Sequence, residues 1–206
     1  MTQARSWNGK DLRDMFAAGS NWLEKSVAEV NAINVFPVPD GDTGTNMLMT
    51  MRSVIEEADR ASDTTVAVMS KTMAHGALLG ARGNSGVILS QIFRGLAKSF
   101  DGKNDFSGSD WAKAMEQAAK TAREGMSNPV EGTILTVIKD AATVAQKCAD
   151  KDPQDLIAIV EEAVREAKES VARTPDLLPA LMEAGVVDAG GFEQPSVFFG
   201  DQAAPP

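Results

Sequence analysis

Two aspartates one residue apart, Asp40 and Asp42, are the residues of this chain best suited to chemistry. Prolines precede them, and a Thr-Gly-Thr-Asn turn at 43–46 leads into a helical pattern. Closely spaced carboxylates suit a hard cation such as Mg²⁺, and a polar turn at a helix start offers backbone N–H groups to an anion. A metal beside a phosphate is the arrangement of a nucleotide-dependent phosphoryl-transfer site.

Other interpretations of the Asp-Gly-Asp segment stay open at this point. Pro, Asp and Gly all favour turns, so a solvated surface turn without a ligand would fit. A calcium loop of the EF-hand type fits poorly, because counting from Asp40 its glycine position holds Thr45 and its closing glutamate position holds Met51. An aspartate-nucleophile phosphatase would place the carboxylates after a buried strand, which Pro37 and Pro39 disfavour.

Three further polar, glycine-bearing segments interrupt the helical patterns, at 80–86, 131–133 and 188–191. The first carries Asn84 and Ser85 at a helix start, where phosphate binding and ordinary capping are both possible. Its Arg82 would either neutralise phosphate charge or form a surface ion pair. Each segment is a weak signal alone, and their common position at helix ends strengthens the joint interpretation.

Composition limits the class of protein. The chain has 206 residues, enough for one substantial domain with its own core. Its 29 acidic against 20 basic residues disfavour electrostatic binding to nucleic acid. The single cysteine, Cys148, excludes an internal disulfide and a multi-cysteine metal site, and predicts a reducing, cytoplasmic location. No apolar run approaches the roughly 20 residues of a membrane span.

Helical periodicity dominates the chain, and strand-like alternation is hard to find. Asp152-Pro153 and Thr174-Pro175 each match an N-cap followed by an N1 proline, so each predicts a helix start. Pro179 then predicts a bend in the last helix. The expected helices are 10–31, 46–60, 65–79, 86–99, 110–126, 133–149, 153–172 and 174–185.

Eight helices joined mostly by short loops predict an all-α fold, an antiparallel up-and-down bundle or barrel. In such a fold, the loops after the first, third and fifth helices share one rim. Those loops carry the Asp-Gly-Asp segment and the segments at 80–86 and 131–133. We therefore expect one site at that rim. Residues 1–191 form the expected domain, and 192–206 have the character of a truncated continuation or a tail.

The segments 34–47, 80–91, 131–137 and 186–191 resemble, in order, the N-terminal ATP-binding domain of bacterial fatty acid kinase. The resemblance covers about residues 8–191. That domain is similar to the nucleotide-binding DhaL subunit of dihydroxyacetone kinases, an all-α barrel of eight helices. The resemblance implies a domain that holds ATP and two Mg²⁺ ions. A separate fatty-acid-binding protein would present the acyl carboxylate, and further C-terminal domains would follow in the full-length kinase.

The resemblance also implies roles for individual residues. Asp40 and Asp42 would ligate the metals, and Asn34 lies nearest the place of a third aspartate in the dihydroxyacetone kinases, so it could offer only a neutral oxygen. Arg82 is the candidate catalytic cation. The expected nucleotide-binding residues are Thr43, Gly44, Thr45, Asn46, Asn84, Ser85, Gly125, Thr133, Ile134, Thr174, Asp188 and Gly190.

A carboxylate is the favoured acceptor of the phosphoryl group on chemical grounds. A fatty acid is already ionised at neutral pH, since its pKa is roughly 4–5, so it needs alignment and charge neutralisation and no general base. An alcohol such as dihydroxyacetone would need help with deprotonation, and no catalytic histidine is evident in this chain. The alternatives are a dihydroxyacetone kinase subunit and a non-catalytic helical module that binds lipid or nucleotide.

Overall fold

The structure is a computed structural model that describes residues 6–62 and 64–192. Regular structure in these residues is helical, apart from one isolated bridge between Trp7 and Phe106, which confirms the all-α prediction. The helices are α1 (Gly9–Ala32), α2 (Thr43–Asp59), α3 (Val66–Gly80), α4 (Gly83–Ser99), α5 (Gly108–Glu124), α6 (Ile134–Ala149), α7 (Leu156–Leu177), α8 (Pro179–Ala184) and α9 (Ala189–Phe192).

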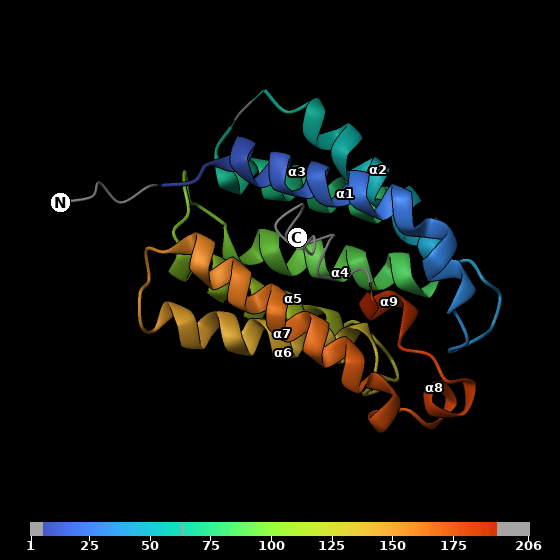
Figure 1. Cartoon of the computed structure of the whole chain (residues 1–206). Helices are drawn as coiled ribbons and strands as arrows, with labels where there is room; N and C mark the ends of the chain where they lie inside the picture. Colours follow the sequence, from blue (N-terminus) through green and yellow to red (C-terminus); the bar gives the residue numbers. More distant parts are fainter. Residues whose placement is uncertain (1–5, 63, 193–206) are drawn as a thin grey trace.

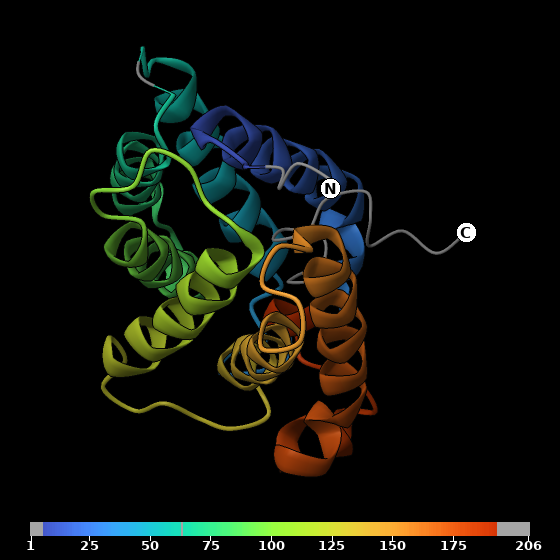
Figure 2. The same cartoon turned by 90° about the vertical axis from the view of Figure 1, so that its left-hand side faces the viewer.

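Each long helix packs against the next one in the sequence, from α1 through α7 (Figure 1). Figure 2 shows the same order from the side, with α1 to α4 in one group and α5 to α7 in the other. The short α9 contacts α1 and α2 in the first group and α6 and α7 in the second. The two groups therefore meet at α9 as well as along α4 and α5.

The core fills the space between these helices. Apolar residues at helical spacing on α1, including Leu12, Phe16 and Leu23, are almost completely buried. The Phe16 ring lies 4.9 Å from Phe93 and 6.4 Å from Trp111, centroid to centroid, so α1, α4 and α5 meet at an aromatic cluster. No helix in the described residues is long and apolar enough to cross a membrane.

Two predicted helix starts were wrong. α7 begins at Leu156 with Asp155 as N-cap, because the Asp155 carboxylate accepts from Ala158 N at 3.0 Å, while Asp152-Pro153 belongs to the preceding turn. α7 then runs through Pro175. Proline has no N–H for the Val171 carbonyl, and the Thr174 hydroxyl donates to that carbonyl at 2.7 Å instead.

The predicted bend at Pro179 was also wrong. The chain breaks at Leu178, and Pro179 is the first residue of α8, a position that needs no N–H. α2 and α4 each start three residues earlier than predicted, at Thr43 and Gly83, so the polar turns form their first turns. Of the predicted tail at 192–206, Phe192 is the last residue of α9, and 193–206 lie outside the described residues.

Candidate functional site

The loops that follow α1, α3 and α5 lie at the same end of the molecule, on the right in Figure 1, as predicted from the alternation of helices. The segment that leads into α9 joins them there. Two adjoining cavities of about 180 Å³ and about 250 Å³ open at this end and share Pro37, Thr43, Asn84 and Ser85 in their walls. Residues from four separate parts of the sequence thus line one continuous space.

The smaller cavity is polar. Its walls come from the Asp-Gly-Asp loop and from the first turn of α4 and comprise Asn34, Pro37, Val38, Asp40, Asp42, Thr43, Gly83, Asn84 and Ser85. Gly83 has φ of +58°, and a Cβ there would lie 2.3 Å from Nδ2 of Asn46. Glycine is therefore required where α4 starts against α2.

The backbone N–H groups at the N-terminus of α2 donate to the side-chain oxygens of two asparagines. Oδ1 of Asn34, which is buried, accepts from the backbone N–H of Asp42 and Thr43, both at 3.2 Å, and from the Thr43 hydroxyl at 3.0 Å. Oδ1 of Asn31, in the last turn of α1, accepts from Gly44 N at 2.8 Å and Thr45 N at 3.3 Å. The first-turn N–H donors of α2 are therefore already satisfied within the protein.

This arrangement leaves the two carboxylates free. Asp42 is the N-cap residue of α2, yet its side chain makes no capping hydrogen bond. Asp40 and Asp42 are both exposed and line the polar cavity, and no partner for either carboxylate is present in the described part of the chain. Because Mg²⁺ keeps several waters and binds through one or two carboxylates plus substrate phosphates, this donor set fits it.

Asn34 does not complete a third metal ligand in this conformation. Its amide oxygen already accepts three hydrogen bonds, and its Nδ2 donates to the Val38 carbonyl at 3.1 Å. Across the described residues, no group of three or more His, Cys, Asp or Glu side chains gathers as a metal site. Asn34 thus holds the loop that presents the aspartates.

The N-terminus of α4 differs from that of α2. Its N-cap residue, Arg82, makes no capping hydrogen bond with its side chain. Within residues 6–62 and 64–192, nothing accepts from the backbone N–H of Gly83, Asn84 or Ser85. These free donors border the cavity that Asp40 and Asp42 also line, so α4 is better suited than α2 to hold a phosphate there.

The larger cavity is mostly apolar and has a polar edge. Its apolar wall comprises Phe36, Pro37, Ile88, Met126, Val130, Ile134 and Leu135, and its polar edge comprises Thr43, Asn84, Ser85, Asn128, Thr133, Asp188 and Gly190. An apolar space with a few polar groups, next to a polar cavity, suits a ligand with a planar base at one end and phosphates at the other.

Asp188 is the buried acid of this site. Burial raises the pKa of its carboxyl to about 6, although the backbone N–H groups of Gly191 and Ile134 donate to it. Ile134 is the first residue of α6, so Asp188 caps that helix from a distance. Thr174 is fully buried behind it and accepts from Asp188 N at 3.0 Å, which makes Thr174 a support for the wall.

Some of the predicted site residues lie outside the two cavities. The Arg82 guanidinium donates to the carbonyls of Ala81, at 2.9 Å, and Leu79, at 3.4 Å, at the end of α3. The Thr45 hydroxyl accepts from Asn31 at 3.0 Å, and Gly125 is an exposed C-cap residue of α5. Gly44 is buried against α1, and Asn46 packs against Gly83.

The sequence did not single out Asn31 or most of the apolar wall. Asn31 sits in the last turn of a helix, and its role depends on α2 folding back onto α1. Ile88, Met126 and Leu135 read as ordinary core residues from periodicity alone. Their positions next to glycine-bearing breaks were the only available signal.

Comparison with known proteins identifies the family of the chain. The DAK2 domain matches residues 37–198. The chain is 44% identical over 187 residues to protein YloV of Bacillus subtilis, an alignment that covers 91% of this chain and 34% of YloV. It is also 44% identical over 184 residues to an uncharacterised protein of Staphylococcus epidermidis, covering 89% of this chain and 33% of that protein.

The chain thus spans about a third of the length of these relatives. DAK2 domains are kinase-related, bind nucleotide and typically pair with other subunits or domains. The matched residues include Asp40 and Asp42, every lining residue of the polar cavity except Asn34, and the buried acid at 188. The chain therefore belongs to the DAK2 domain family, the nucleotide-binding part of dihydroxyacetone-kinase-like proteins.

Proposed function

We propose that this domain binds ATP with Mg²⁺ at the rim and donates the γ-phosphoryl group to a fatty acid carboxylate. The observation that carries the proposal is one polar cavity with two uncommitted carboxylates, Asp40 and Asp42, facing the unpaired N–H groups at the start of α4. Acids alone would repel a polyphosphate. Acids beside free donors suit a metal-bound polyphosphate.

Each part of the site has a distinct task in this proposal. Asp40 and Asp42 hold the magnesium, for which the resemblance implies two ions, and the bound metal supplies charge neutralisation for the phosphates. The N–H groups of Gly83, Asn84 and Ser85 bind phosphate oxygens. The apolar cavity takes the base. Asn31 and Asn34 hold the metal loop, the segment between α1 and α2 that carries Asp40 and Asp42. Arg82 is the candidate cation for the phosphate charge, and its exposed guanidinium donates here to the carbonyls at the end of α3.

The proposed phosphoryl acceptor, a carboxylate, is chosen because it needs no histidine base. The only histidine of the sequence, His75, is exposed on α3, and it does not line either rim cavity. A carboxylate acceptor is already ionised and needs only alignment, whereas an alcohol must lose a proton. Dihydroxyacetone remains the second candidate, because the family includes dihydroxyacetone kinases.

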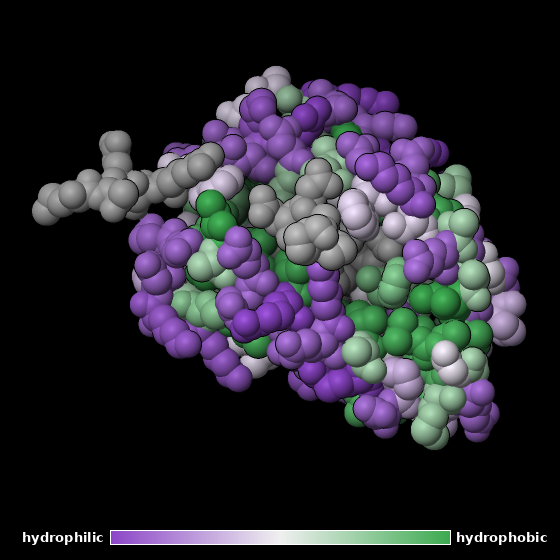
Figure 3. All heavy atoms as spheres, in the orientation of Figure 1, coloured by the Kyte–Doolittle hydropathy of each residue, from purple (hydrophilic) through white to green (hydrophobic). Residues whose placement is uncertain are grey.

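The surface around the rim supports a partner that presents the acceptor. Figure 3 shows apolar side chains gathered near α8 and the segment that leads to α9. Val38 on the metal loop, Leu177 at the end of α7 and Met182 on α8 are 56%, 50% and 61% exposed. Exposed apolar surface beside a site is typical of a protein interface, and we propose that a fatty-acid-binding protein docks there.

The proposal is tested in two steps. Calorimetric titration of the chain with ATP should show tight binding only with Mg²⁺, and the double variant Asp40→Ala, Asp42→Ala should lose the Mg²⁺ effect while its helical circular dichroism is retained. Equal ATP binding with and without Mg²⁺ would contradict the metal assignment. The second step is turnover with Mg·ATP and either an acyl-loaded fatty-acid-binding protein or dihydroxyacetone bound to its own carrier subunit, which identifies the acceptor.

A further inference from the structure

A second cavity region lies outside the rim, in the groove between α5 and α6. Its volume is about 520 Å³, larger than either cavity of the proposed nucleotide site. The floor is formed by small or apolar side chains, among them Ala119, Leu135 and Ala142. α5 and α6 are consecutive helices that pack against each other, side by side in Figure 2, and the lining residues of the groove come from both of them.

Charge along this groove is opposite in sign to the charge of the whole chain. The chain carries a net charge of −9. The groove is lined by Lys120 and Arg123 on α5 and by Lys139 and Lys147 on α6, against one acid, Glu116. Basic side chains therefore flank an apolar floor on both sides, on a protein that is otherwise acidic.

These cations differ in how far they are already paired. Arg123 forms an ion pair with Glu131 at 2.5 Å, and Lys120 lies 4.0 Å from Glu124. In the part of the chain that the structure describes, neither Lys139 nor Lys147 takes part in an ion pair, and both are exposed. On the α6 side of the groove, the charge of Lys139 also acts on Glu131 and helps to lower the pKa of that carboxyl, whereas Lys147 has no acid paired with it in the described residues.

The shape of the groove indicates the kind of ligand. A small-molecule site encloses most of its ligand and orients it with a few convergent polar groups. Here the four cations are exposed and the floor carries no buried charged group. An open apolar channel between two helices, flanked by charges, suits a third amphipathic helix laid along it. Rows of acids on that helix would meet the two rows of cations.

We propose that the α5–α6 groove is a docking site for an acidic amphipathic helix of a partner polypeptide. The apolar face of that helix packs on Ala119 and Ala142, and its acids face Lys120, Lys139 and Lys147. Long-range repulsion from the acidic remainder of the surface steers the partner to this face. The proposal does not depend on the proposed kinase function, because none of these lysines lines the rim cavities.

The groove also adjoins the rim. Leu135 lines both the groove and the apolar cavity, and Arg123 holds Glu131, which in turn accepts from the Thr136 hydroxyl at 2.7 Å. The Thr136 hydroxyl, followed by Arg123, lowers the pKa of Glu131. A helix seated in the groove therefore lies one side chain away from the loop before α6.

The test uses a synthetic helical peptide of about five turns, with a leucine and alanine stripe flanked by glutamates. A second peptide with lysine in place of each glutamate is the probe control. The protein variants are Lys139→Glu with Lys147→Glu in the groove, and Lys98→Glu with Lys151→Glu as a matched charge reversal outside it. Both control lysines are exposed and absent from the groove lining.

Fluorescence anisotropy and amide chemical shifts give the two readouts. We expect the acidic peptide to bind wild type and the control variant within about twofold, to bind the groove variant at least about tenfold more weakly, and to shift the amides of Ala119, Ala142 and Thr143. Absence of binding, equal loss in both variants, binding of the lysine peptide, or shifts on another face would overturn the proposal.

Discussion

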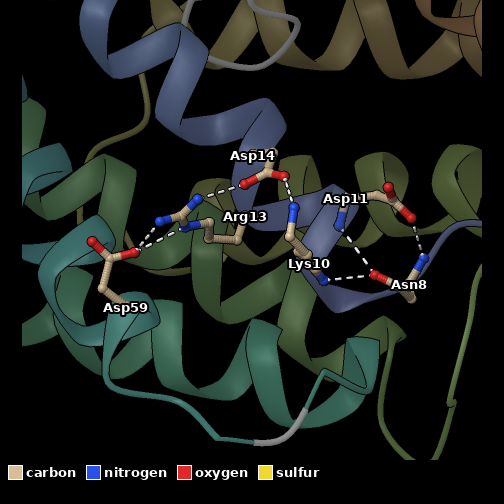
Figure 4. A network of polar contacts seen from close by, with 6 residues as sticks. All are labelled: Asn8, Lys10, Asp11, Arg13, Asp14 and Asp59. Carbon is tan, nitrogen blue, oxygen red and sulfur yellow. Dashed lines mark hydrogen bonds and ion pairs between the residues drawn. The ribbon is translucent and has the colours of Figure 1, made fainter.

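The starts of α1 and α2 satisfy the same chemical need in different ways. At α1, Asn8 Oδ1 accepts from the backbone N–H of Lys10 and Asp11, and the Asp11 carboxylate accepts from Asn8 N at 2.9 Å (Figure 4). This is a capping box built from residues three apart. The Asp11 carboxylate is therefore engaged in capping its own helix, α1.

At α2 the caps come from elsewhere in the chain. Asn31 lies 13 residues before Gly44, whose N–H it accepts, and Asn34 lies 8 residues before Asp42. The Asp42 carboxylate therefore has no capping duty and lines the polar cavity. Because Asn31 and Asn34 cap α2, the stability of this helix does not depend on the Asp42 carboxylate.

The surroundings of the two starts differ in the same way. Around α1, Arg13 bonds both Asp14 and Asp59, and Lys10 pairs with Asp14 at 2.6 Å, so these two acids have cations, while Asp11 is engaged in the capping box (Figure 4). Around α2, the acids of the metal loop have none in the described residues. Paired acids indicate a structural role, and exposed unpaired acids on a cavity wall indicate a ligand.

Removal of Asp42 at the start of α2 and of Asp11 at the start of α1 should separate the ligand-binding role from the capping role most clearly. Asp42→Ala should lower Mg·ATP-dependent phosphoryl transfer by at least about 100-fold, or about 2.7 kcal/mol of barrier, with little change in the free energy of unfolding, because the side chain makes no cap. Asp11→Ala should cost about 1 kcal/mol of stability and leave transfer intact. Turnover assays and urea unfolding of both variants measure the contrast. Loss of stability without loss of transfer in Asp42→Ala would reverse our assignment.

The N-terminus of α6 is also capped from a distant part of the chain, and its cap is a buried acid, Asp188. Its pKa is raised from 3.8 to about 6, so its contribution to stability is full below about pH 4 and is lost as pH rises through 6. Relative to Asp188→Asn, which does not titrate, wild type should lose up to about 3 kcal/mol across that window.

Urea unfolding at a series of pH values measures this difference. Asp101→Asn is the control, because a hydrogen bond from Lys71 lowers the pKa of Asp101, and its stability contribution is lost as pH falls. A wild-type protein that gains stability relative to Asp188→Asn as pH rises would show that the sign is wrong.

Loss of the remote cap at α2 should lower the free energy of unfolding more than loss of a local cap, because the buried Asn34 oxygen accepts several hydrogen bonds. Asn34→Ala leaves two backbone N–H groups and a hydroxyl without their acceptor, and should cost about 2–3 kcal/mol of stability together with affinity for Mg·ATP. Asn34→Asp keeps an acceptor oxygen and should restore part of the stability. Chemical denaturation and calorimetry give the two quantities, and unchanged Mg·ATP affinity in a folded Asn34→Ala protein would remove Asn34 from the site.

The local cap at α1 should show the smallest effect. Asn8→Ala should cost about 1 kcal/mol, because the freed N–H groups lie at a helix end that water can reach, and Mg·ATP binding should not change. Thermal or urea unfolding measures the cost. A change in Mg·ATP affinity in Asn8→Ala would mean that the two helix starts are coupled through α1, against the separation drawn here.

The sequence by itself determined much of this protein. Helical periodicity fixed the all-α class and most helix positions, and the alternation of helices placed the three glycine-bearing loops on one rim. Both follow from local rules, since amphipathic periods and turn residues act within a few positions. The same rules misplaced the starts near Asp152 and Thr174. Asp155 is the residue that caps α7, and a hydroxyl bond from Thr174 to the Val171 carbonyl lets α7 continue through Pro175.

Only the tertiary structure decided which polar groups have no hydrogen-bond partner within the described part of the protein. Whether the N–H donors of α2 or of α4 are available depends on Asn31 and Asn34, which reach α2 only after α1 and α2 have packed together. The buried state of Asp188 and the cation-lined groove between α5 and α6 arise in the same way, from contacts between distant segments. Residue types name the candidates, and the packing of helices settles which of them already have partners.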